Sequence, residues 1–257
     1  MTVHAYLVTR PTFDVDVFLN FLATEKMDWH RSHGACDPEE IVESAGRICY
    51  LSFGARQSPR TNKQYIQHLI DMGHESVLEH VSWGFILTGV SRAFTHQLVR
   101  HRAGFSFSQL SQQYHDERDA KFKEPGELEK FPTAHAAWQN AIQTARSAYR
   151  VILDSLVELE AKSNVENRQE VRRAIRSAAR SVLPNATETT IFITANARAL
   201  RHFFSVRGTL IGDSEMRQVS ALLLGQLKSE APALFADFEI KTLPDKSPQV
   251  VRRSTSV

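Results

Sequence analysis

VSWGFILTGV, residues 81–90, is the stretch around which we expect this protein to fold. Trp83, Phe85 and Leu87 fall on one alternation, which is the period of a β-strand with one buried face. A second stretch, Thr187–Thr194, is rich in β-branched residues and predicts another strand. Long helical patterns separate the few predicted strands, so the sequence indicates an α/β or α+β core.

Helical patterns fill most of the remaining sequence. Asp37 and Pro38, followed by two glutamates, predict a helix start with Asp37 as the capping acid, the proline in the first turn and further acids near the positive end of the helix dipole. Thr61 opens another helical pattern, and Gly73 closes it where a left-handed residue is usual. The other predictions are an edge strand at His4–Thr9, helices at Asp14–Glu25, Ser91–Arg102, Ala134–Lys162 and Val165–Val182, an exposed loop at Glu117–Pro132, and helices capped by Asn196 and by Asp213 or Ser214.

Composition limits the classes of protein to consider. The 257 residues contain 31 lysines and arginines against 29 acids, so the net charge of +2 gives no general attraction for nucleic acid. The two cysteines are too few for a disulfide framework, no apolar run reaches the roughly 20 residues of a membrane span, and the start has no signal-peptide pattern. We therefore expect a cytoplasmic protein with no nucleic-acid or membrane partner. No linker divides the chain, so we expect one domain over residues 1–244 and a flexible tail over 245–257.

The densest group of polar residues follows the first long strand. Gln97, Arg100, His101 and Arg102 precede a stretch rich in serine and glutamine. On a helix, Gln97 and Arg100 share one face while the other two project elsewhere, so one segment can touch two ligands. Arginine forks and hydroxyl groups suit phosphate oxygens. The structural alternative is a set of solvent-facing cations that complements a helix C-terminus.

Two further clusters of arginine lie later in the sequence. Arg180 ends a series that recurs every four residues from Arg168, and it alone lies near the start of the second long strand. We expect the rest of that series to form a solvated helix face. The last cluster follows this strand, where α/β proteins commonly hold ligands, although a capping residue on a polar helix would look the same. Its members are Asn196, Arg198, Arg201, His202 and Arg207.

The sequence gives little support for a bound metal ion or for a nucleophilic cysteine. The segment His74–His80 lacks the two histidines four residues apart on a helix that bind zinc, so we expect no metal. Cys36 and Cys49 have no Ser/His/Asp arrangement near them in sequence, and we expect both to pack as small apolar residues. No Gly-x-Gly-x-x-Gly or Walker motif occurs, so a dinucleotide would bind without a Rossmann signature.

Taken together, these residues resemble the flavin-dependent thymidylate synthase family. The family signature of Arg-His-Arg followed by a downstream serine is matched by Arg100-His101-Arg102 and Ser111. The resemblance extends from roughly Glu39 to Phe235 in the order of the family, through His74-Glu75-Ser76, Ala179–Pro184 and Asn196-Ala197-Arg198. It implies a single α/β domain with a central mixed β-sheet flanked by helices, in a homotetramer whose active sites are shared between subunits.

The resemblance implies an FAD-dependent methyltransferase of nucleotide biosynthesis. The reaction would convert dUMP to dTMP at uracil C5, with methylenetetrahydrofolate as one-carbon donor and NADPH as the reductant of the flavin. The family holds FAD at the positions of Ser76, Arg100, His101, Arg102, Gln109, Asn196, Arg198 and His202. It holds the nucleotide at the positions of Gln97, Arg100, Ser111, Gln113, Arg180 and Arg207. Arg207 is the catalytic position, because an arginine beside the uracil ring stabilises its developing negative charge.

One departure from the family bears on the substrate. Gln113 stands where the family commonly has an arginine that contacts the nucleotide. Losing a charge-assisted contact weakens binding by about 1 to 3 kcal/mol unless another cation, such as Arg118, replaces it. Three alternatives therefore stay open: a UMP methylase of nucleoside-antibiotic biosynthesis, a flavin-binding relative without turnover, and a non-enzymatic nucleotide- or RNA-binding module that stacks bases on Phe105 and Phe107.

Overall fold

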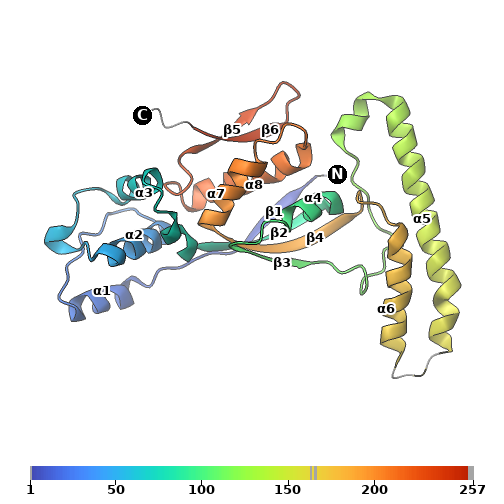
Figure 1. Cartoon of the computed structure of the whole chain (residues 1–257), viewed down its shortest axis with the longest axis horizontal. Coiled ribbons are helices and arrows are strands. Elements are labelled where there is room, and N and C mark those ends of the chain that lie inside the picture. Colours follow the sequence, from blue (N-terminus) through green and yellow to red (C-terminus); the bar gives the residue numbers. More distant parts are fainter. Residues whose placement is uncertain (1, 163, 165–166, 254–257) are drawn as a thin grey trace. The chain divides into compact units, whose positions relative to one another are not determined.

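The computed structural model describes residues 2–162, 164 and 167–253. Its helices are α1 (Val15–Thr24), α2 (Asp37–Tyr50), α3 (Asn62–Asp71), α4 (Arg92–Leu98), α5 (Pro132–Ala161), α6 (Arg168–Ala179), α7 (Ala197–Arg207) and α8 (Ser214–Glu230). Its strands are β1 (His4–Thr9), β2 (Ser82–Ser91), β3 (Phe105–Gln109), β4 (Glu188–Asn196), β5 (Phe238–Thr242) and β6 (Pro248–Arg252), and short 3-10 turns include η2 (Glu75–His80) and η5 (Arg180–Val182) (Figure 1).

Four of the strands form one sheet in the order β1-β2-β4-β3. The stretch at 81–90 forms β2, where Trp83, Phe85 and Leu87 are fully buried, and the predicted edge strand is β1. These strands and the surrounding helices confirm the predicted α/β class. Contacts divide the chain into two compact units, a first unit of Met1–His4, Leu87–Arg100 and Phe107–Phe192 and a second unit of Ala5–Ile86, His101–Ser106 and Ile193–Val257. The boundaries cut across the strands, and one catalytic domain over residues 1–244 stays a prediction.

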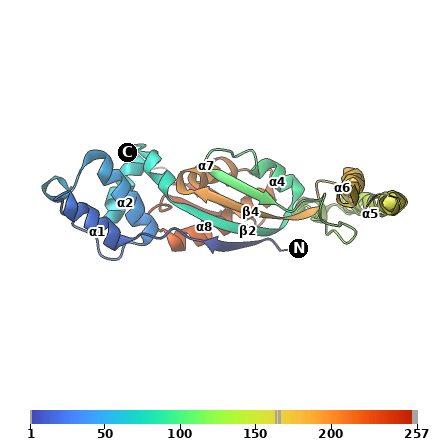
Figure 2. The same ribbon diagram turned by 90° about the horizontal axis from the view of Figure 1, so that it is seen from below.

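A pair of long helices is the main helical feature of the first unit. α5 begins at Pro132, in a first-turn position where the missing N–H of proline costs nothing. α6 runs beside α5 in both views (Figures 1 and 2), and Tyr149, Leu153 and Ile175 form a buried cluster between them.

The predicted exposed loop at Glu117–Pro132 is wrong at its first residue, because Glu117 is buried and its backbone N–H donates to Tyr149 Oη at 3.0 Å. Within the described residues, no helix combines the length and apolarity that crossing a bilayer requires.

The second unit has an aromatic core. Phe204 of α7 packs against Phe235 and Phe238, with ring centroids 6.0 and 5.8 Å apart. Arg201, on the same helix, is buried and forms an ion pair with Asp237 at 2.6 Å. Arg201 is therefore a structural residue of this core, although its place in the sequence put it among the candidate ligand-binding arginines.

Three segments differ from the sequence-based expectation. The helix predicted to reach Arg102 ends at Leu98, so Arg100 to Arg102 lie in the connection to β3. β3 itself was not predicted, although its half-buried and exposed residues alternate as in a strand. The predicted tail at 245–257 is wrong over Pro248–Arg252, which forms β6 and pairs antiparallel with β5. β6 is ordered because Val250 is fully buried; residues 254–257 lie outside the described part of the chain.

Candidate functional site

The strongest contact between predicted site residues joins His101 and Arg207 in the second unit. Arg207 is the last residue of α7, and its Nε donates a hydrogen bond to His101 Nε2 at 3.0 Å. Because arginine Nε always carries hydrogen, His101 Nε2 is the acceptor and the imidazole proton lies on Nδ1. Burial, then the nearby Arg207 and His202, lower the pKa of His101 below its usual value. His101 is therefore a neutral imidazole with one free N–H donor at neutral pH.

Packing fixes the orientation of this imidazole. The ring of His101 meets Phe203 edge-on, with centroids 5.3 Å apart, and His202 edge-on at 6.1 Å. Phe203 is fully buried and also contacts Phe105 of β3 at 6.1 Å. The connection after α4 is thus held against α7 by apolar contacts, which leaves the polar edge of His101 for Arg207 and a ligand.

The loop after Arg102 lies against the start of α7. Asn196 caps α7 by accepting from Ala199 N at 2.8 Å, and its own N–H donates to Gly104 O at 3.0 Å. Gly104 has a φ of +73°, and a Cβ there would lie 2.7 Å from Asn196 Nδ2 and from Ala199 Cβ. Only glycine fits this approach without strain. Backbone N–H groups at the N-terminus of α7 favour an anion, and the exposed Arg102 precedes Gly104 by two residues in the sequence.

Arg198 is not a free cation. Its Nη1 donates to Glu79 Oε1 at 2.5 Å, and Glu75 lies 3.7 Å from its Nε. The hydrogen bond with Glu79 raises the pKa of Arg198 above its usual value. Ser76 lies in the same turn, η2, between these two glutamates in sequence. An anionic ligand of Arg198 would have to compete with the carboxylates of η2.

In the first unit, the structure adds an arginine that was not predicted. Arg92 begins α4, and its Nη2 donates to Leu110 O at 2.8 Å. Burial, opposed by Glu117 and aided by the positive charge of Arg180, lowers the pKa of Arg92. Arg92 Nε is buried without a hydrogen-bond partner among the described residues, and such orphaned donors commonly await a ligand or a water. Nothing in the sequence indicated a ligand-binding role for Arg92, which directly follows the helix-capping Ser91.

Gln109 and Ser111 are tied to neighbours within the same unit. The amide Nε2 of Gln109 donates to Thr95 Oγ1 at 3.0 Å and more weakly to Thr189 Oγ1 at 3.4 Å. Ser111 Oγ accepts from Gln113 N at 3.3 Å. These bonds hold the serine- and glutamine-rich stretch in one conformation as it leaves β3.

Gln113 has an arginine beside it, but not the expected one. Arg173 of α6 donates from Nε to Gln113 Oε1 at 3.1 Å. Arg118, the predicted replacement for the missing family arginine, is held by Asp154 at 2.5 Å and Asp116 at 3.5 Å. The cation next to Gln113 is therefore Arg173, which lies outside the series of arginines considered from the sequence.

Gln97, Arg100 and Arg180 carry no side-chain hydrogen bond or ion pair to other described residues. Gln97 and Arg100 are exposed, and Arg180 is half-buried in η5. The predicted shared helix face of Gln97 and Arg100 is wrong, because α4 ends between them. Three polar side chains that have no partner in the described part of the chain are therefore available to a ligand.

The predicted positions divide unevenly between the two units. The nucleotide positions lie in the first unit, with the exception of Arg207. The flavin positions lie in the second unit, with the exceptions of Arg100 and Gln109. A common pocket for both sets stays a prediction. Within the described residues, no three His, Cys, Asp or Glu side chains gather as metal ligands would, and a metal-free site also stays a prediction.

Cys36 is unsuited to attack a substrate. Cys36 and Cys49 are both free thiols. Cys36 is half-buried, but Cys49 is exposed, so the expectation that both pack as small apolar residues is wrong for Cys49. Burial raises the pKa of Cys36 to about 11, so its thiol stays protonated at neutral pH. A thiolate is the nucleophilic form of cysteine, and Cys36 is therefore inert.

Known proteins match most of this chain. Residues 33–233 match the family profile described as thymidylate synthase complementing protein. A flavin-dependent thymidylate synthase from Mycobacteroides abscessus is 44% identical over 228 residues, which cover 88% of this chain and 89% of that protein. A protein of the same name from Mycobacterium tuberculosis (strain ATCC 25618 / H37Rv) is 44% identical over 229 residues, with the same coverage.

A solved structure shares the fold. It is the UMP/dUMP methylase PolB from Streptomyces cacaoi, bound with 5-Br dUMP, and it matches with a TM-score of 0.62. The match covers 91% of this chain and 93% of that chain at 20% sequence identity. At this identity the likeness concerns the fold.

Proposed function

This chain belongs to the flavin-dependent thymidylate synthase family, and we propose that it methylates dUMP at C5 to give dTMP, with methylenetetrahydrofolate as one-carbon donor and NADPH as reductant. The family membership makes it an enzyme rather than a non-enzymatic nucleotide- or RNA-binding module. The observation that carries the proposal is the family match over residues 33–233, within which lie all the residues assigned to flavin and nucleotide.

The residues of the second unit fit a flavin dinucleotide. The Gly104 approach leaves no room for a Cβ, the N-terminus of α7 and Arg102 favour a pyrophosphate, and His101 offers an N–H donor. We assign flavin binding to Ser76, Arg100, His101, Arg102, Gln109, Asn196, Arg198 and His202. The bound flavin supplies hydride chemistry, and the protein orients it and excludes water.

We assign the nucleotide to the arginines and hydroxyls of the first unit together with Arg207. The set is Gln97, Arg100, Ser111, Gln113, Arg180 and Arg207. Arginines suit the phosphate, because their forks donate two charge-assisted hydrogen bonds. Arg207 acts catalytically by stabilising negative charge on the uracil ring, which makes C5 more nucleophilic. Because His101 is neutral, it places no second positive charge beside Arg207.

We expect no nucleophilic role for Cys36, because burial raises the pKa of its thiol to about 11. We further propose that residues 1–244 act as one catalytic domain, in a cytoplasmic homotetramer whose subunits share the sites.

The proposed reaction can be tested directly on purified protein. Purified protein should carry flavin absorbance and should release tritium from C5-labelled dUMP in the presence of methylenetetrahydrofolate and NADPH. Flavin-loaded protein that releases no tritium from labelled dUMP or UMP would exclude the reaction.

UMP is the second candidate substrate. Gln113 in place of the family arginine favours it, and the PolB structure is named as a UMP/dUMP methylase. A 2′-hydroxyl is admitted or rejected by small changes in pocket contacts. Competition between the two labelled nucleotides in one reaction decides between them.

A further inference from the structure

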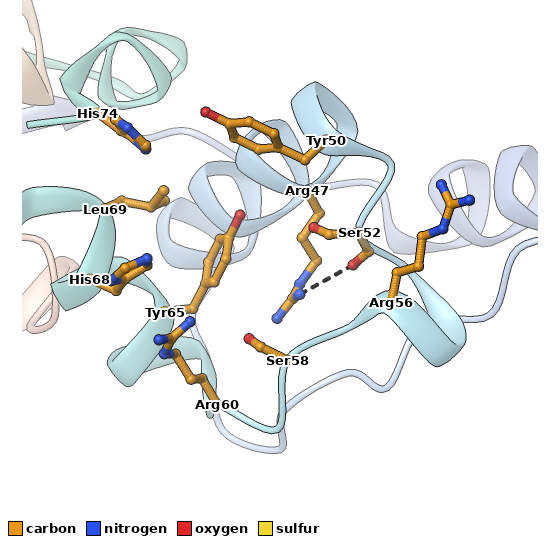
Figure 3. A pocket seen from close by; sticks show the side chains of 10 residues that line it. All are labelled: Arg47, Tyr50, Ser52, Arg56, Ser58, Arg60, Tyr65, His68, Leu69 and His74. Carbon is orange, nitrogen blue, oxygen red and sulfur yellow. Dashed lines mark hydrogen bonds between the residues drawn. The ribbon is translucent and has the colours of Figure 1, made fainter. Parts of the chain in front are cut away.

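We propose that a pocket of the second unit, separate from the positions assigned above, binds an oxyanion carried by a co-substrate. The pocket lies between α2, α3 and the segment that joins them (Figure 3). Its volume is about 310 Å³, at the lower end of the roughly 300–1,000 Å³ of ligand sites. Three arginines, two histidines, two tyrosines, two serines and a leucine line it, and none of these ten described residues is acidic.

Arg47 provides the first sign of a ligand. It is fully buried, and its guanidinium group points into the pocket (Figure 3). Its Nε donates to Glu43 Oε1 at 2.7 Å and its Nη1 to Ser52 O at 3.3 Å. Its Nη2 is buried and has no hydrogen-bond partner among the described residues. An unpaired donor on a buried charged group is costly, so an acceptor is expected opposite it.

Ser58 provides a second, independent sign. Its Oγ is also buried without a hydrogen-bond partner in the described part of the chain. Ser58 lines the same pocket as Arg47, and Figure 3 shows the two side chains facing a common space. Two orphaned donors in one cavity indicate one acceptor that serves both.

The charge of the pocket selects an anion. Glu43 already neutralises Arg47, and its second oxygen accepts from Asn62 Nδ2 at 2.8 Å. Arg56 and Arg60 form no ion pair with any described carboxylate, so they leave the pocket positive. Carboxylate and phosphate oxygens are the acceptors that match guanidinium donors in geometry and charge.

One side of the pocket offers aromatic surface. The rings of Tyr50 and His74 are stacked, with centroids 6.2 Å apart and planes 28° apart. Tyr65 stands close to α2 only because residue 46 is glycine, where a Cβ would lie 2.9 Å from Tyr65 Oη. Aromatic surface beside unpaired arginines suits a molecule with a flat ring and an anionic arm. Resting on the proposed function, two co-substrates have that chemistry: the folate, through its glutamate carboxylates, and NADPH, through its phosphates.

The test measures binding to the flavin-loaded protein by calorimetry, and its arms separate the two sources. The carboxylate arm compares p-aminobenzoylglutamate with p-aminobenzoate, and the phosphate arm compares NADPH with NADH. We expect the more anionic member of one pair to bind about tenfold more tightly. Arg60→Gln should abolish that preference. Arg10→Gln, which removes the same charge from an exposed arginine that does not line the pocket, should preserve it.

Arg60 is chosen because it is exposed, whereas replacing Arg47 would leave the buried Glu43 unpaired and risk unfolding. Equal binding within both pairs, or a preference that Arg60→Gln leaves unchanged, would overturn the proposal. If the ligands bind only to flavin-free protein, the pocket belongs to the flavin site, and this result would also overturn the proposal. Since the readout is binding, protein without turnover still yields a result, and failure here leaves the proposed reaction standing.

Discussion

Arg207 Nε donates to His101 Nε2 over 3.0 Å, so the protonation of one side chain controls the placement of the other. The imidazole must be neutral to accept this bond. Its lowered pKa, caused first by burial, keeps it neutral at neutral pH. The contact joins the end of α7 to the connection between α4 and β3. We assign His101 to the flavin and Arg207 to the nucleotide, so the contact links residues proposed for two different ligands.

Arg207→Ala should abolish methylation while the flavin stays bound. Removing one preorganised charge-stabilising group lowers kcat by about 100- to 1,000-fold. Turnover of labelled dUMP and the flavin absorbance of the purified variant measure the two effects separately. Arg253→Gln, at an exposed arginine paired with Glu239, is the matched control. A variant that lost flavin but regained turnover with added FAD would place Arg207 at the cofactor instead.

Stability should fall as the solution becomes acidic, in part through His101. The pKa of His101 is lowered in the folded chain relative to about 6.5 in the unfolded chain, so the unfolded chain takes up a proton first. The contribution of His101 is therefore complete above about pH 6.5 and is lost as pH falls through the folded pKa. Urea unfolding between about pH 8 and pH 5 should give a shallower pH slope for His101→Gln than for the unmodified protein. Identical slopes would contradict this.

Arg173→Gln should weaken nucleotide binding, because Arg173 supplies the cation beside Gln113. Loss of a charge-assisted hydrogen bond of about 1.5 to 3 kcal/mol corresponds to a rise of roughly 10- to 100-fold in the nucleotide Kd. Arg118→Gln is the control in the same unit, since Asp116 and Asp154 already hold Arg118. Gln113→Arg should bring little gain, because it would set two cations side by side. Equal rises of the nucleotide Kd in Arg118→Gln and Arg173→Gln would contradict the assignment of Arg173, rather than Arg118, to the nucleotide.

Two arginines on α7 should differ in their effect on stability. Arg201→Ala leaves the buried Asp237 with only the partly exposed Arg252, and breaking a buried pair costs about 3 to 5 kcal/mol of unfolding free energy. Arg198→Ala removes an exposed pair with Glu79 that solvent screens, so a clearly smaller loss is expected. Chemical denaturation of both variants gives the comparison. Similar losses would mean that burial does not decide the value of these pairs.

Cys36→Ala and Cys49→Ala should each retain turnover. The Cys36 thiol has a pKa of about 11 and is protonated at neutral pH. Tritium release by either variant at the rate of the unmodified protein would agree with this. Complete loss of release from a variant that still binds flavin would require a thiol in the chemistry.

Helix starts could be predicted from the sequence because capping is local. Asp14, Thr61, Asn196 and Asp213 each cap a helix through the side chain, as the sequence predicts for Thr61 and Asn196. The predicted cap at Asp37 is wrong, because α2 begins at Asp37 and Cys36 is its N-cap residue. β3 and the β5–β6 pair were missed, since a short strand depends on partners distant in sequence. The end of α4 was placed too late because Val99 and Arg100 are compatible with a helix and carry no stop signal.

Residue type and order were enough to predict the family but not the pairing of its arginines. The ion pair of Arg198 with Glu79 joins residues from distant parts of the sequence. The same holds for the contact of Arg173 with Gln113 and for the burial of Arg201. Which arginines are neutralised by the protein, and which remain for a ligand, follows from tertiary contacts alone.

The β6 strand has a practical consequence for any shortened form of this enzyme. Val250 N–H donates to Gly208 O at 3.0 Å, and a Cβ at Gly208 would lie 2.7 Å from Val250 Cβ. Gly208 directly follows Arg207, so β6 supports the residue next to the arginine to which we assign the catalytic role. A premature stop before Pro248 would keep every assigned ligand contact yet remove this brace, and a bulky affinity tag fused there would strain it.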